Sequence, residues 1–446
     1  MQEYDVVIIG AGIAGMQGAL DLAEKGHKIL LVEKKPSIGG KMIQLSKVFP
    51  TLDCSSCITT PVMNNVFQHE NITILVNSEV TTTKKNISTS DFELIINKKA
   101  TLVDNDKCTA CGSCEQVCPV EIPSEFDMGL SARKAIYIPF QTAMPQKAIL
   151  DLDHCIACGA CFKACPGEAI DFAQQDQEIL VKARSILVST GFELTPLGEK
   201  EEYGGGKFDN VISSLTMERI LAPNGPFQGI RRPSDGKVPM RIAYIQCAGS
   251  RDQSLGRPYC SRICCMYAIK QSMLISGALP IVSVTIYNMD IRSFGKGYDQ
   301  FYQNAKDMGV EFVKGKVAKI KEDPITKNLT LKVERIEEDG GLTEEEYDMV
   351  VLSLGVAPSE NPTANIDIEI DEDGFLLLND PIIDPQNTSI EGVFSAGMVN
   401  GPKDIVDSIL ESSSAAMYID NYLHIIKSDI VSEKNDKKRV ILETMK

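Results

Sequence analysis

The chain has 446 residues, enough for two to four domains, and its 43% hydrophobic and 24% charged content is that of an ordinary soluble globular protein. The net charge of −16 argues against a general nucleic-acid binder, which needs a basic surface to displace counterions from phosphates. This acidity provides either solubility or a docking surface for a protein partner. No apolar run reaches the ~18 residues that a membrane span requires. The first ten residues lead directly into a predicted strand without a basic leader, so we expect a cytoplasmic protein.

A strand–helix–strand unit opens the chain. Its first strand runs into the glycine-rich turn formed by Gly10, Gly12 and Gly15. The first glycine permits a tight turn, the second lets the backbone approach a pyrophosphate, and the third lets the following helix pack closely on the strand. The second strand, residues 28–32, ends at Glu33, where an acid would bind a ribose hydroxyl. The unit therefore predicts a dinucleotide-binding site.

Three later segments resemble those of flavoproteins with two dinucleotide-binding domains. The Gly39–Gly40 pair resembles the segment that these proteins place beside FAD. The strand before Gly191 and the string "GVFSAGMVNG" fit the same superfamily. Met398 stands where that family's AGD motif has its acid, so we assign no carboxylate contact to the FAD ribitol there. The candidate FAD-binding residues are Gly10, Gly12, Ala14, Gly15, Glu33, Lys34, Gly39, Gly40, Gly191 and Gly397.

Eight cysteines form two copies of the motif C-x2-C-x2-C-x3-C-P, at residues 108–119 and 155–166. In bacterial-type ferredoxins three closely spaced thiolates of such a run hold one cubane cluster and the fourth reaches the other cluster. We expect a two-cluster module spliced between strands of the flavin domain, with zinc or free thiols as the alternatives and a helical segment at 126–140. The expected ligands are Cys108, Cys111, Cys114 and Cys165 for one cluster, and Cys155, Cys158, Cys161 and Cys118 for the other.

A second nucleotide-binding-like domain begins with a predicted strand at residues 241–246. Where a pyridine-nucleotide disulfide oxidoreductase would have a second glycine-rich turn, this chain has "CAGSRD". Four cysteines within 19 residues suffice to bind one more [4Fe–4S] cluster. A zinc site, or free thiols with a redox disulfide, are the alternatives. The expected ligands are Cys247, Cys260, Cys264 and Cys265.

The whole arrangement resembles the A subunit of heterodisulfide reductase and its bacterial and archaeal relatives. The resemblance covers residues 1–425 and includes strings such as "FPTLDCSSC" and "NGPKDIVDSI". It implies FAD, three [4Fe–4S] clusters and flavin-based electron bifurcation or confurcation, in which an electron pair enters the flavin and single electrons leave toward ferredoxin and a higher-potential acceptor. Lys270 matches a family lysine near flavin N5, and Glu218 is a candidate partner for it. An ordinary solvated lysine and a glutamate capping the core edge are the alternatives.

These motifs predict a parallel, doubly wound α/β fold. It comprises a split Rossmann-like FAD domain, a degenerate second nucleotide-binding-like domain as in thioredoxin reductase, and an inserted bacterial-type two-cluster ferredoxin module. The expected segments are 1–100, 177–237 and 361–425 for the FAD domain, 101–176 for the ferredoxin module, 238–360 for the second domain, and 426–446 for a charged tail that is either partly disordered or a helix docking on a partner.

The resemblance also implies partners: other subunits of a heterodisulfide-reductase-like complex, a hydrogenase- or formate-dehydrogenase-type donor subunit, and ferredoxin, around a homodimeric core. One alternative is an oxidoreductase like the small subunit of glutamate synthase, although the missing glycine-rich turn after Ile245 speaks against it. A non-bifurcating FAD and iron–sulfur relay or scaffold is another. Cys54 and Cys57 stay open as a redox pair, ligands to a cluster completed elsewhere, or inert thiols.

Overall fold

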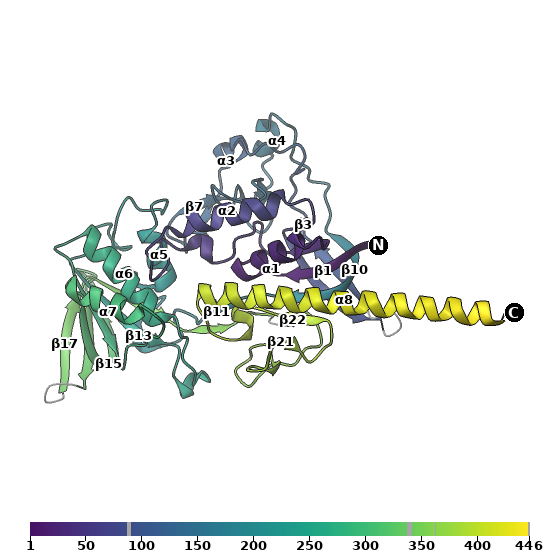
Figure 1. The fold of residues 1–446 in the computed structure, drawn as a ribbon. Helices are drawn as coiled ribbons and strands as arrows, with labels where there is room; N and C mark the ends of the chain where they lie inside the picture. Colours follow the sequence, from purple (N-terminus) through teal and green to yellow (C-terminus); the bar gives the residue numbers. More distant parts are fainter. Residues whose placement is uncertain (87–90, 337–340, 362, 445–446) are drawn as a thin grey trace.

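The computed structural model describes residues 1–86, 91–336, 341–361 and 363–444, with side chains described up to residue 428. Two sheets with their own helices lie next to each other, and a small module lies against the first of them (Figure 1). A two-stranded ladder between β11 (Phe192–Leu194) and β19 (Val356–Pro358) lies where the chain leaves each sheet. In the described part of the chain, no helix is both long and apolar enough to cross a membrane.

The first sheet has nine strands in the order β20-β21-β22-β10-β1-β2-β3, with β4 and β5 paired beside β10. Its central strands β3, β2, β1, β10 and β22 run parallel, as the doubly wound prediction requires. One face is covered by α1, α2 and the beginning of α8, and the other by the β4–β5 hairpin and a later loop. The bounds are β1 (Gln2–Ile9), α1 (Ile13–Glu24), β2 (Ile29–Val32), α2 (Ser55–Gln68), β3 (Ile72–Leu75), β4 (Ser78–Lys85), β5 (Phe92–Lys98), β10 (Gln177–Val188), β20 (Leu378–Asp380), β21 (Asp384–Thr388) and β22 (Val393–Ser395).

The cysteine-rich module leaves this sheet after β5 and returns to it at β10, and these two strands pair antiparallel along their length. The insertion point is thus a closed strand pair, as the flanking sequences predicted. The helix predicted at 126–140 is wrong: the segment forms turns and two short strands. Met128 and Gly129 both have positive φ, which interrupts a helix, and the strands pair with partners elsewhere in the module. The bounds are α3 (Ser113–Val117), β6 (Glu121–Pro123), β7 (Ala132–Lys134), β8 (Ile136–Tyr137), β9 (Ile149–Leu150) and α4 (Ala160–Ala164).

The second sheet has seven strands in the order β12-β18-β13-β14-β15-β16-β17. Strands β12, β18, β13, β14 and β15 run parallel, and β15–β17 form an antiparallel meander. Three helices pack on one face of the parallel strands, so those strands are buried on both sides and almost wholly apolar. The bounds are β12 (Val211–Ser213), α5 (Ser214–Leu221), β13 (Arg241–Ala248), α6 (Cys264–Ala278), β14 (Ser283–Asn288), α7 (Tyr298–Asp307), β15 (Glu311–Glu322), β16 (Leu329–Arg335), β17 (Gly341–Tyr347) and β18 (Met349–Leu354).

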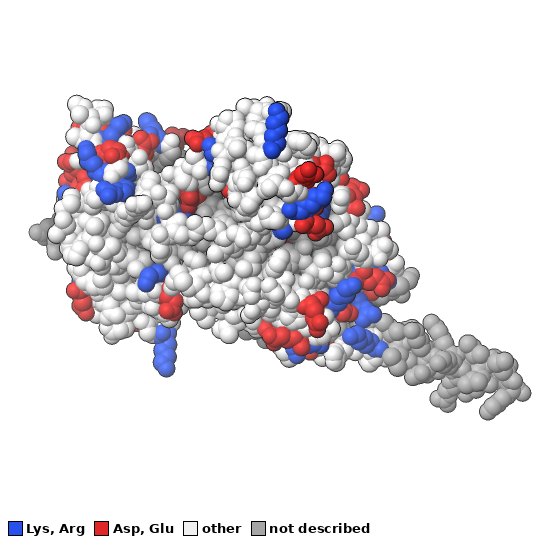
Figure 2. Space-filling view, turned by 90° about the horizontal axis from the view of Figure 1, so that it is seen from above, with Lys and Arg blue, Asp and Glu red and all other residues white. Residues whose placement is uncertain are grey.

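The C-terminal helix α8 (Ile405–Thr444) runs without a break across the boundary predicted between residues 425 and 426. Its beginning packs on α1, where Ser412 Oγ donates a 2.6 Å hydrogen bond to the carbonyl of Ala14. Its far end extends beyond the body of the protein (Figure 1). On the face seen in Figure 2, Lys and Arg side chains are interspersed with Asp and Glu, so the charge is mixed there.

Candidate flavin and iron–sulfur sites

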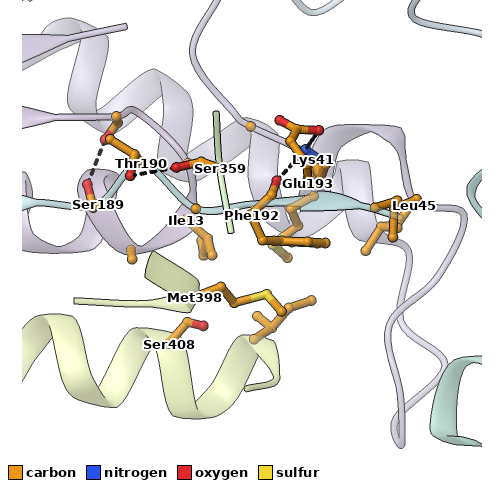
Figure 3. A pocket seen from close by; sticks show the side chains of 18 of the residues that line it. Ile13, Lys41, Leu45, Ser189, Thr190, Phe192, Glu193, Ser359, Met398 and Ser408 are labelled. Carbon is orange, nitrogen blue, oxygen red and sulfur yellow. Dashed lines mark hydrogen bonds and ion pairs between the residues drawn. The ribbon is translucent and has the colours of Figure 1, made fainter. Parts of the chain in front are cut away.

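A cavity of about 330 Å³ opens where the two sheets meet, lined by residues of both. Met398 and Ser408 lie on the opposite side of the cavity from Thr190 (Figure 3). Of the predicted glycines outside the wall, Gly397 would place a Cβ 2.9 Å from that of Ala14, and Gly39 N–H donates to the carbonyl of Ala11. Seven of the predicted FAD-binding residues lie on the wall, namely Gly10, Gly12, Ala14, Glu33, Lys34, Gly40 and Gly191.

The glycine turn leaves a cradle that side chains would fill. Gly10 has a φ of +100°, and a Cβ there would collide with the backbone of Ser189. A Cβ on Gly15 would collide with the carbonyl of Gly10, and one on Gly40 would stand 2.8 Å from Cα of Gly12. The N-terminus of α1 follows this turn, so free backbone N–H groups point toward the cavity. These residues fit a nucleotide pyrophosphate.

Glu33 is buried and accepts two backbone hydrogen bonds at the edge of the cavity. Its Oε2 accepts from Ala11 N at 2.8 Å and its Oε1 from Lys35 N at 2.9 Å. Burial raises the pKa of Glu33, and the N–H groups of Lys35 and Ala11 oppose that shift. Each carboxylate oxygen keeps a lone pair, so the side chain is oriented and can still accept from a ribose hydroxyl.

The substitution Glu33→Gln is expected to weaken FAD binding by about 10-fold or more, since a hydrogen bond to a charged group contributes about 1.5–3 kcal/mol. Fluorescence titration of the apoprotein with FAD measures the dissociation constant. Glu360→Gln is the matched control, because Glu360 lines the same cavity but its side chain is 82% exposed and pairs only with Lys34. Equal affinity of both variants would exclude a ribose contact at Glu33.

A buried ion pair faces the predicted flavin residues from the second domain. Lys270 and Glu218 are 1% and 2% exposed, and Lys270 Nζ lies 2.5 Å from Glu218 Oε1. Lys270 Nζ also donates to the carbonyl of Lys47 at 2.7 Å, and Glu218 accepts from Gln271 and from the backbone and hydroxyl of Ser46. Burial lowers the pKa of Lys270, and Glu218 opposes that shift. The solvated-lysine alternative is therefore wrong, and the expected pair is present.

The eight cysteines of the ferredoxin motifs gather in two places. Cys114 and Cys161 are buried, whereas Cys111 and Cys158 are exposed. Gly112 and Gly159, in the left-handed conformation, begin the two short helices α3 and α4 in the same way. One pocket is lined by Cys108, Cys111, Cys114 and Cys165, and another by Cys118, Cys155, Cys158 and Cys161. This grouping is the one that the crossed ligand assignment predicts.

The four remaining predicted ligands gather around the start of α6. Cys264 and Cys265 are its first residues, Cys247 ends β13 with a φ of +58°, and Cys260 lies in the loop between. Burial raises the pKa of Cys264 well above its usual value, and the other three thiols raise it further, so all four lie close enough to interact. Arg251 hydrogen-bonds the Cys247 thiol and opposes the rise of its pKa that burial causes.

Among the residues that the structure describes, no group of three or more His, Cys, Asp and Glu side chains is arranged to hold a single metal ion. A zinc ion would bring four sulfurs to about 2.3 Å from one centre, so the thiols as they stand do not form the alternative zinc sites. A cubane cluster takes its four thiolates at four separate iron corners. Three sets of four thiols therefore fit iron–sulfur clusters better than mononuclear metals.

The last two cysteines form a disulfide, Cys54–Cys57, at the start of α2. Cys54 is the residue before the helix, and its Sγ accepts a hydrogen bond from Cys57 N at 3.3 Å. Of the three open alternatives, this geometry does not leave two free thiols.

Comparison with known proteins agrees with the order of these sites along the chain. Residues 5–47 match the FAD binding domain family, 107–170 the 4Fe-4S dicluster domain family and 276–418 the pyridine nucleotide-disulphide oxidoreductase family. Two relatives are iron–sulfur A subunits of CoB–CoM heterodisulfide reductase. The chain is 47% identical over 415 residues to the second such protein of Methanopyrus kandleri and 48% over 417 residues to that of Methanocaldococcus jannaschii, in each case over 92% of this chain and 63% of the relative. The chain belongs to the family of heterodisulfide reductase A subunits.

A third family member is the A subunit of the H2:CoB–CoM heterodisulfide, ferredoxin reductase of Methanothermobacter thermautotrophicus, 45% identical over 92% of this chain and 62% of its own length. The chain thus spans less than two thirds of these relatives. Thioredoxin reductases share the fold: that of T. acidophilum has a TM-score of 0.54 at 18% identity, covering 96% of this chain and 100% of its own, and that of Lactococcus lactis 0.53 at 17%, covering 94% and 99%. Flavin and iron–sulfur domains in one thioredoxin-reductase-like chain are therefore established for this family member.

Sequence reasoning missed part of the cavity wall. Lys41 Nζ bonds the carbonyl of Phe192 at 2.7 Å and Glu193 Oε2 at 2.9 Å (Figure 3), and burial lowers its pKa while Glu193 opposes that shift. Its place directly after Gly39–Gly40 was the available signal. Glu411, which accepts from Gly397 N at 2.6 Å, carried no such signal because it lies on α8.

Proposed function

We propose that the chain is the FAD- and iron–sulfur-containing electron-transfer subunit of a heterodisulfide-reductase-like complex, which bifurcates or confurcates electrons between a two-electron donor, ferredoxin and a higher-potential acceptor. The observation that carries the proposal is the shared cavity. Its first wall is made of predicted FAD residues, and its opposite wall includes Lys270 and Gln271 of α6. The same helix begins with Cys264 and Cys265. The name of the Methanothermobacter relative supports the reaction class.

FAD, when bound, supplies both one- and two-electron chemistry, whereas a cubane cluster takes one electron at a time. The chain's own residues would set the conditions for that exchange. The Gly10 turn and Glu33 would hold the nucleotide, and Lys270 would place a positive charge in the cavity wall, where it favours negative charge on a neighbouring group. Because Lys270 and the pair Cys264–Cys265 share one rigid helix, cation and thiolates keep a fixed spacing.

The proposal includes three [4Fe–4S] clusters, a homodimeric core, ferredoxin, a hydrogenase- or formate-dehydrogenase-type donor subunit and further subunits of the complex. A glutamate-synthase-like oxidoreductase fits less well. The residues that follow β13 contain Cys247 at positive φ, hydrogen-bonded by Arg251, in place of a phosphate-binding glycine turn. Hydride transfer from a nicotinamide at this position has no nucleotide cradle.

A reductive titration of the anaerobically purified protein tests the proposal, with flavin absorbance and EPR spin count followed together. We expect one FAD and three [4Fe–4S] clusters per chain, with almost no organic-radical signal at any potential, because bifurcation needs the two one-electron potentials of the flavin to be crossed. A large and stable radical signal would contradict bifurcation and favour the single-electron relay. Spins for two clusters alone would contradict the assignment of Cys247, Cys260, Cys264 and Cys265.

A further inference from the structure

The disulfide Cys54–Cys57 takes no part in the proposed function, yet it lies on the segment that closes the flavin cavity. Residues 45 and 47–49 line the cavity, and Lys47 forms an antiparallel bridge with Cys54. The backbone N–H of Val48 donates to the carbonyl of Asp53 at 2.9 Å. The disulfide and the cavity wall are therefore two sides of one hairpin.

The inner side of this hairpin is held by the buried ion pair. Lys270 Nζ donates to the carbonyl of Lys47, the residue bridged to Cys54. Glu218 accepts from the backbone N–H of Ser46 at 3.0 Å. A rearrangement of the chain at Cys54 would thus reach the Lys270–Glu218 pair through two backbone hydrogen bonds.

The two sulfurs have different surroundings, as an exchangeable disulfide requires. Cys57 is exposed, so an external thiolate can approach its sulfur. Cys54 is half-buried at the N-cap position, and its sulfur already accepts the Cys57 N–H. A thiolate released at Cys54 would keep that hydrogen bond and lie at the positive end of the dipole of α2, and both effects make it a better leaving group.

We propose that Cys54 and Cys57 are a redox-active dithiol–disulfide pair that exchanges with an external dithiol and transmits its state to the flavin cavity. In the first step a thiolate of the dithiol bonds to the sulfur of Cys57, the Cys54–Cys57 bond breaks, and Cys54 leaves as a thiolate. The second thiol of the partner then attacks the mixed disulfide and releases Cys57. The protein gains two electrons and two protons, and the partner becomes a disulfide.

The test uses the whole wild-type holoprotein, with dithiothreitol as the probe dithiol. The native protein is equilibrated at a series of ratios of reduced to oxidised dithiothreitol and then alkylated, and the peptide containing both cysteines is quantified by mass spectrometry. We expect both thiols to become labelled together, from near zero to near completion, along a two-electron curve. We also expect the absorbance band of bound flavin to shift along the same curve.

The double variant Cys54→Ser/Cys57→Ser is the control for the coupling, and its flavin band should not respond to dithiothreitol. Three results would overturn the proposal. The pair could resist reduction by excess dithiothreitol, which would make it a structural disulfide. It could be fully alkylated without a reductant, which would make it two inert thiols. The double variant could lose iron, which would make the pair cluster ligands. Because alkylation is read on the wild-type chain, failure of the double variant to fold leaves these outcomes decidable.

Discussion

Replacing Lys270 by Met is expected to destabilise the protein by about 3–5 kcal/mol, the cost of breaking a buried ion pair and leaving one charge behind. The Glu218 carboxylate would remain buried, with only Ser46 and Gln271 as hydrogen-bond donors. Glu218→Gln leaves the ammonium of Lys270 in the same position and should cost a similar amount. The double variant should be more stable than either single one, because both charges then disappear together.

Chemical denaturation of the reconstituted protein under anaerobic conditions gives the three midpoints for this double-mutant cycle. Lys99→Met/Asp176→Asn is the matched control, since this ion pair is exposed and should leave the midpoint unchanged. The midpoint potential of bound flavin is the second measurement. It should fall in Lys270→Met, because a cation near the flavin stabilises its negatively charged reduced form. Additive single variants with an unchanged flavin potential would show that the pair is uncoupled and remote from the flavin.

The pair also shows where sequence reasoning stops. The sequence predicted that Lys270 follows the cysteines on one helix, and α6 confirms this. It could not establish that Lys270 is buried, because the groups around it come from α5 and from the loop at 46–47, far away along the chain. The glycine turn and the ferredoxin motifs were predictable because each carries its geometry in residues that are close in sequence.

The failed prediction at 126–140 has the same cause. The segment has helix-compatible residues at both ends, but the left-handed conformations at Met128 and Gly129 break it. The short strands that follow are specified by pairing with residues 121–123 and 149–150, which no local pattern reveals. Arg133 then joins Glu125 and Asp151 across this segment. Tertiary pairing here overrides the local propensity.

The substitution Cys264→Ala is expected to remove one whole cluster and reduce the iron content from about 12 to about 8 atoms per chain. Cys264 is buried against the other three thiols at the start of α6, so water cannot replace its sulfur as a ligand. The two ferredoxin pockets are formed by other segments and should keep their EPR signals. Iron analysis and the EPR spin count of the reduced protein measure both effects.

Two comparison variants make the iron count specific. Cys57→Ala changes a cysteine outside all three sets, and its iron content should stay at about 12 atoms per chain. Cys165→Ala should also lose about four atoms, but from the pocket it shares with Cys108, although Cys165 stands in the second motif. Loss of zinc with unchanged iron in Cys264→Ala would contradict the third cluster and identify a mononuclear site. If Cys165→Ala instead removed the signal of the pocket lined by Cys155, the crossed ligand assignment would be wrong, because each motif would then bind its own cluster.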